Sequence, residues 1–159
     1  MKELIHQYAA YDLWANTRLV ERLEREDERL LDRHVKSSFP SLRQTMLHIR
    51  DAGNTWYQRI FGEPALAFGA EIGSVLKMST VMQDRVRGLD EAGLNAPVHY
   101  ARANGMSYAQ PRWQLLMHCF NHASYHRGQV ITIMRQLDLG DVPGTDLVAY
   151  QRLLRPGKQ

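Results

Sequence analysis

The chain has 159 residues, of which 44% are hydrophobic and 23% are charged, a balance typical of one globular domain over residues 1–159. Its apolar runs are far shorter than the roughly 18 residues that cross a bilayer, and a single cysteine, Cys119, excludes an internal disulfide framework. The formal net charge is +3, but basic residues are scattered among acidic ones, which argues against nucleic acid as a partner. The N-terminal stretch is too polar for a signal peptide, so we expect a cytoplasmic protein without a membrane partner.

Helical spacing of apolar residues begins at the N-terminus. A first helix is predicted from Met1 to about Glu26, with core positions three or four residues apart at Leu4, Tyr8, Tyr11, Ala15, Leu19 and Leu23. The linker RHVKSSFP follows at residues 33–40.

A second helix is predicted from Ser41 to about Phe61. Ser41 can cap it and Gln44 completes a capping box, while Gly62 and Pro64 end it. Its core stripe carries Thr45, Ile49, Ala52, Trp56 and Ile60.

The second half of the chain contains two more long helices. Residues 70–90 favour a third helix, although Gly73 weakens it. Residues 95–110 alternate in polarity around Asn104-Gly105, which predicts a β-hairpin. A long helix then runs from Pro111 to about Leu139, ended by Gly140, and residues 145–154 form a short last helix. We therefore predict an all-α four-helix bundle with a small hairpin before the last long helix.

The long helix carries a row of three histidines, His118, His122 and His126, spaced four residues apart. Two of them fall on the predicted core stripe of Leu115, Cys119, His122, His126, Val130, Ile133 and Leu137. Arg127, Arg135 and Gln136 are predicted to face water on the opposite side.

Two adjacent histidines on a core stripe need partners for four ring nitrogens. A buried polar group without a partner costs about 1–3 kcal/mol, and a divalent metal would accept one nitrogen from each ring. Ordinary core or surface histidines are the alternative. A third ligand has to come from another helix, and His48 lies beside the core stripe of the second one. Three ligands along one straight helix would span about 12 Å, so His118 is predicted to be a pocket or structural residue.

The motifs of the chain resemble those of the DinB family. The run LLMHCFNHASYHRGQVITIMRQLDLGDVP carries an Asn-His pair followed four residues later by His-Arg-Gly-Gln, and YAAYDLWANTRLVERL, SSFPSLRQTMLHIRDAGNTWYQRI and DLVAYQRL match other family segments. The likeness is weakest at residues 62–107. It implies a four-helix bundle, a homodimer and a divalent metal held by His48, His122 and His126. Tyr125 stands where the family usually has a histidine that is not a ligand.

Three neutral histidines leave at least one metal position open, as in catalytic sites, and they suit zinc or nickel. We expect a small-molecule hydrolase acting through metal-bound water. The first alternative is an S-transferase that uses a low-molecular-weight thiol, which the resemblance supports. The second is a stress-induced metal-binding protein without activity.

The catalytic residues are not identified by the sequence. Asp12, Asn16 and Asp51 are predicted to be solvated or capping residues, with an approach to a ligand or the pocket as the alternative. Gln129 is predicted to support a ring N–H of a histidine ligand. Cys119 is predicted to be a small buried hydrophobe.

Overall fold

The computed structural model of the protein describes residues 1–101 and 105–155. Their helices and strands follow the chain in the order α1 (Lys2–Leu23), α2 (Glu28–Leu31), α3 (Leu42–Phe61), α4 (Ser74–Arg87), α5 (Glu91–Asn95), β1 (Pro97–Ala101), β2 (Ser107–Pro111), α6 (Arg112–Gln136) and α7 (Leu147–Leu153). None of the described helices is both long and apolar enough to cross a membrane.

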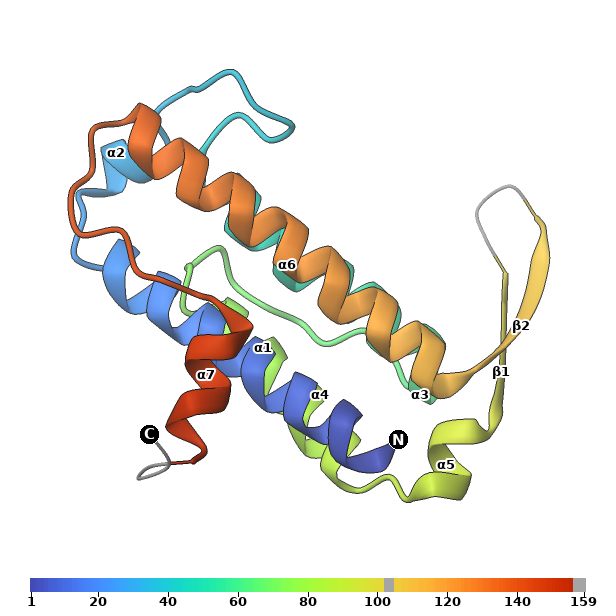
Figure 1. The fold of residues 1–159 in the computed structure, drawn as a ribbon. Helices are drawn as coiled ribbons and strands as arrows, with labels where there is room; N and C mark the ends of the chain where they lie inside the picture. The colour runs from blue at the N-terminus through green and yellow to red at the C-terminus, as the bar shows by residue number, and fades with distance from the viewer. Residues whose placement is uncertain (102–104, 156–159) are drawn as a thin grey trace.

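The four long helices form a bundle (Figure 1). Around the bundle the order is α1, α4, α3 and α6, so each of these helices packs against two neighbours. The hairpin projects from the end of the bundle where α6 begins, with β1 against α3 and β2 against α6. The short helix α7 lies against α1. The predicted helical bundle with a small hairpin is confirmed, and the short helices α2 and α5 are additions to it.

Local sequence signals set the ends of α3. The side chain of Ser41 accepts a hydrogen bond of 3.2 Å from the backbone N–H of Gln44, which is the first half of the predicted capping box. Gly62 ends the helix in the left-handed conformation, with φ of 69°, where a residue without Cβ is favoured. This helix therefore has the predicted boundaries, and these boundaries fix the position of His48 in the bundle.

The end of α6 differs from its prediction. The helix stops at Gln136, and Asp138, with φ of 56°, takes the left-handed position that Gly140 was expected to provide. The N–H groups of Asp138 and Leu139 donate to the carbonyls of Arg135 and Met134, at 3.1 and 2.9 Å, which is the pattern of a Schellman motif. An aspartate can adopt this backbone conformation at modest cost, so the glycine was not needed.

The core face of α1 is rotated slightly from the predicted one. Leu4 was expected inside but is 53% exposed, and Ile5 is buried in its place. The buried line of this helix includes two polar residues, Asp12 and Asn16, between its apolar ends. A search for apolar periodicity passes over those two positions, and this displaced the predicted stripe.

The hairpin pairs Pro97 with Pro111 and Ala101 with Ser107 in an antiparallel ladder. Its residues alternate between an exposed face and a partly or fully buried one, and the second face carries Val98, Tyr100, Tyr108 and Gln110. The predicted turn at Asn104-Gly105 lies partly outside the described residues, because Asn104 is not among them. Gly105 has a φ of 81°, as a glycine in a turn allows.

Candidate metal centre

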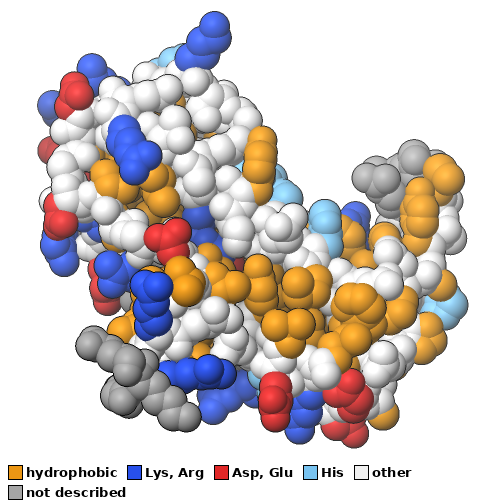
Figure 2. Space-filling model, in the orientation of Figure 1, with side chains coloured by type: hydrophobic (Ala, Val, Ile, Leu, Met, Phe, Trp, Pro, Cys, Tyr) orange, Lys and Arg blue, Asp and Glu red, His pale blue; other side chains and the backbone are white. Residues whose placement is uncertain are grey.

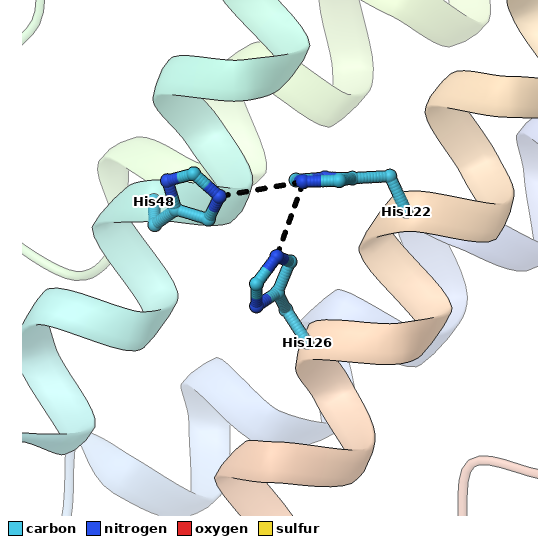
Figure 3. A group of neighbouring side chains, drawn as sticks. All are labelled: His48, His122 and His126. Carbon is cyan, nitrogen blue, oxygen red and sulfur yellow. Dashed lines mark hydrogen bonds between the residues drawn. The ribbon is translucent and has the colours of Figure 1, made fainter. Parts of the chain in front are cut away.

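Three histidines from two helices meet on one side of the bundle. His48 comes from α3, and His122 and His126 lie one turn apart on α6, with their rings pointing at one another (Figure 3). The Nε2 atom of His122 is 3.3 Å from Nε2 of His48 and 3.1 Å from Nε2 of His126. One ligand atom from each ring lies within 4.8 Å of the other two. The structure thus brings together the three residues that the sequence selected, while their role as ligands stays a prediction.

The spacing of these nitrogen atoms fits a shared ion. Two ligands of a tetrahedral ion, each at about 2.0–2.1 Å, lie about 3.3 Å from one another. The measured distances of 3.3 and 3.1 Å are close to that value. An all-nitrogen, uncharged set of donors suits a late first-row ion such as zinc or nickel better than magnesium or calcium.

Hydrogen bonding fixes the tautomer of His126. Its Nδ1 lies 2.8 Å from Oε1 of Gln129, and the amide nitrogen of Gln129 donates to Oγ of Ser38 at 3.0 Å. Because the amide oxygen can only accept, Nδ1 of His126 carries the proton and donates it. In the neutral ring Nε2 then presents a bare lone pair to the other two histidines. Gln129 therefore supports a ring N–H as predicted, in the way that acceptors behind metal ligands do.

Burial and the neighbouring rings keep His122 and His48 neutral. Burial, followed by the nearby rings of His126, His48 and His118, lowers the pKa of His122 to about 4. Burial and His126 also lower the pKa of His48, although the exposed carboxylate of Asp51 opposes this shift. Neutral imidazole is the form that binds a metal, so these rings are available as ligands at neutral pH.

Phe39 covers part of the centre. Its ring stacks on His48 with 4.1 Å between centroids and meets His126 edge-on at 5.5 Å. It belongs to the linker at residues 33–40, which the Ser38–Gln129 bond ties to α6. Phe39 was not predicted to take part in the site; its one signal in the sequence is a large aromatic ring in a short linker.

The fourth histidine of interest, His118, lies beside the triad but outside it. It is exposed, its ring centroid is 6.2 Å from that of His122, and it meets Trp56 edge-on at 4.8 Å. His118 is thus outside the group of candidate ligands, and its role as a pocket or structural residue stays a prediction. Tyr125 is 62% exposed and packs edge-on against His126 at 4.9 Å.

The thiol of Cys119 is unsuited to catalysis. The side chain is buried in the core, and burial raises its pKa far above the ordinary range. Since the thiolate is the nucleophile and the ligand, Cys119 acts as the small buried hydrophobe that was predicted.

Three polar residues lie where they were not expected: Arg127 was predicted to face water, and Asp12 and Asn16 to be solvated or capping residues, but all three are buried. Arg127 is 1% exposed, and its Nη1 donates to Asp12 at 2.6 Å and to Asn16 at 3.0 Å. Asn16 in turn donates to Ser79 of α4 at 2.9 Å. The reason is that α6 packs against both α3 and α1. Consecutive residues point about 100° apart on a helix, so His126 and Arg127 can both be buried while they face different parts of the bundle.

Comparison with known sequences identifies the family of the chain. A sequence model of the DinB family matches residues 1–156. The chain is also similar to the protein named DinB of Bacillus subtilis (strain 168). The two are 24% identical over an alignment of 165 positions, which covers 94% of this chain and 95% of that protein. Because the family match spans nearly the whole chain, and the bundle carries a three-histidine group that could hold a metal, this protein belongs to the DinB family.

Proposed function

We propose that the protein is a metal-dependent hydrolase for a small-molecule ester or amide, with a divalent ion, zinc or nickel, held by His48, His122 and His126. The observation that carries this proposal is the convergence of three histidine ring nitrogens that could hold a metal, with the exposed His118 beside them. Structural zinc ions usually have four protein ligands, whereas catalytic ones have three and an open position. When bound, the ion would supply a positive charge that polarises a substrate carbonyl and lowers the pKa of water at that position.

The surrounding residues have separate tasks in this proposal. Gln129 holds the ring of His126 in the tautomer that binds. Phe39 excludes water from one side of the triad by covering His48 and His126. His118 is exposed and next to His122, so its ring can accept a proton from a reacting water or return one to a leaving group.

A thiol S-transferase is the second candidate. The one cysteine of the chain is buried and its pKa is raised, so a thiol nucleophile has to be a separate small molecule. The same centre would bind that thiol as thiolate, because a nearby divalent ion lowers its pKa. A requirement for added thiol separates the two reactions.

Metal content is the first test. Tag-free protein analysed by elemental mass spectrometry should contain about one zinc or nickel per chain, and His48→Ala, His122→Ala and His126→Ala should each lose most of it. His99→Ala is the matched control, because His99 is exposed on the hairpin. A wild type that stays metal-free after incubation with zinc and with nickel would refute the site.

Activity is the second test. The metal-loaded protein should hydrolyse members of an ester and amide panel without added thiol, and the His126→Ala variant should not. Turnover that appears only with a low-molecular-weight thiol would favour the transferase. One metal per chain with no exchangeable water on it would identify a structural ion.

A further inference from the structure

A hollow lies between the body of the protein and the projecting hairpin, and Figure 2 shows histidine side chains on its floor. Phe39 contacts two rings of the triad, those of His48 and His126. The third ring, that of His122, lies beside the ring of His118, which in turn contacts Trp56. The ring contacts thus lead from the triad toward the hairpin.

Three further aromatic residues, Trp56, Tyr100 and Tyr108, continue this line; we call them the aromatic strip. Trp56 lies on α3 and meets Tyr100 of β1 edge-on at 5.6 Å. Tyr100 stacks on Tyr108 of β2 with 5.6 Å between centroids and 22° between planes. All three are only partly buried, so each keeps surface for another molecule.

The two tyrosines of the strip are held in place by hydrogen bonds. The hydroxyl of Tyr100 donates to the side chain of Gln110 at 2.6 Å, and the amide of Gln110 donates to Gln114 of α6 at 3.2 Å. Tyr108 donates to the sulfur of Met106 at 3.7 Å. Rings that are fixed before binding lose little conformational freedom when a ligand docks, which favours affinity.

We propose that the aromatic strip binds the organic part of the substrate and selects an aryl or similarly flat unsaturated group joined to a polar head. The head would bind at the histidine centre, so this inference rests on the proposed function. Flat aromatic groups gain from stacked and edge-on contact with Trp and Tyr rings beyond simple burial. Small aliphatic substrates would reach the same centre without that gain.

A pair of hydroxamic acids tests the proposal. Benzohydroxamate and acetohydroxamate carry the same metal-binding head, and only the first has a ring. Calorimetric titration of the zinc-loaded full chain should show that benzohydroxamate binds about 10-fold more tightly, as expected for a ring with stacking partners. In Trp56→Leu and Tyr100→Leu the preference should fall to about 2-fold or less, while the affinity for acetohydroxamate stays the same.

Two controls keep the result specific. Trp14→Leu makes the same substitution on α1, where the ring contacts Tyr11 and Tyr150, and it should retain the wild-type preference. Tyr108→Leu, near the end of the hairpin ladder, tests the strip if Trp56→Leu does not fold. Quenching of tryptophan fluorescence by benzohydroxamate should likewise be lost in Trp56→Leu and retained in Trp14→Leu.

The outcomes are distinguishable. Equal affinity for the two hydroxamates, or a preference that survives the Trp56 and tyrosine variants, would overturn the role of the strip and leave the metal centre intact. Zinc-loaded protein that binds neither hydroxamate would overturn the open position, and with it both the proposed function and the strip.

Discussion

Two polar clusters meet the same helix at consecutive residues, and they differ in how their atoms are matched. Arg127 points toward α1, where its guanidinium donates to the carboxylate of Asp12 and the amide oxygen of Asn16. It also lies over the ring of Tyr11 at 5.3 Å. Donors there face acceptors and a positive charge faces a negative one. Among the buried side-chain nitrogen and oxygen atoms of the described residues, Nε of Arg127 alone has no hydrogen-bond partner.

His126 points the other way, toward groups of its own kind. Its Nε2 lone pair meets Nε2 of His122, which also faces Nε2 of His48. Each neutral ring has a single N–H, and that of His126 is on Nδ1, so at least one of the three converging nitrogen atoms has no hydrogen-bond partner within the cluster. A bound cation would accept the lone pairs of the three nitrogen atoms. The positive charge of Arg127, in contrast, is already balanced by the carboxylate of Asp12. Arg127 is therefore a structural residue, because its partners are hydrogen-bond acceptors, one of them a carboxylate of opposite charge. The histidines are candidate ligands, because their ring nitrogens converge on one another.

The largest expected effect comes from breaking the complementary cluster. Arg127→Met leaves the carboxylate of Asp12, which is 7% exposed, without its cation. Removing one partner of a buried ion pair costs about 3–5 kcal/mol, so the free energy of unfolding, measured in urea on metal-free protein, should fall by that amount. The double variant Asp12→Leu/Arg127→Met should recover much of the loss. Arg135→Met, at an exposed position of the same helix, should change the free energy of unfolding little. Equal losses in Arg127→Met and Arg135→Met would contradict the structural role of Arg127.

A smaller effect is expected from loosening the histidine centre without removing a ligand. Gln129→Leu removes the acceptor of the His126 Nδ1–H, so the ring can rotate or take the other tautomer. Loss of such a partner typically lowers metal affinity by about 10- to 100-fold, and zinc competition with a chromophoric chelator measures it. Gln136→Leu, exposed on the same helix, is the matched control. Unchanged affinity in Gln129→Leu would show that the hydrogen bond does not orient the ligand.

The sequence was sufficient where the determinant was local or periodic. Ser41 and Gly62 bound α3 as predicted, because caps depend on neighbouring residues alone. His122 and His126 lay on the stripe that apolar periodicity defines, and His48 lay beside the stripe of the second helix, a choice with which the family motifs agreed. Asp12 and Arg127 were misplaced because each looks like a surface residue until the other is known. Pairing across α1 and α6 is a property of the packed bundle. The contact of Phe39 with the triad depends likewise on the path of a linker, which has no periodicity to read.

The last expected effect concerns pH, and it arises at the histidine centre. The folded pKa of His122 is lowered to about 4, mainly by burial, whereas an unfolded histidine has a pKa near 6.5. Between these values the unfolded chain binds more protons than the folded one, so stability rises with pH. The contribution of the neutral His122 ring to stability is present above about pH 6.5 and is lost as the pH falls toward 4. Thermal unfolding of chelator-treated protein should therefore show a midpoint that decreases over this window.

His122→Gln tests the origin of that decrease, because it removes the titrating ring while it keeps a polar side chain. Its midpoint should change less between pH 7 and pH 4.5 than that of wild type, whereas His34→Gln, at an exposed position of the linker, should follow wild type. Bound zinc should delay the decrease to lower pH, since the ion competes with protons for the same lone pairs. If His122→Gln follows the wild-type profile, other groups control the acid sensitivity. The burial of a neutral His122 ring would then not be the cause of the acid sensitivity.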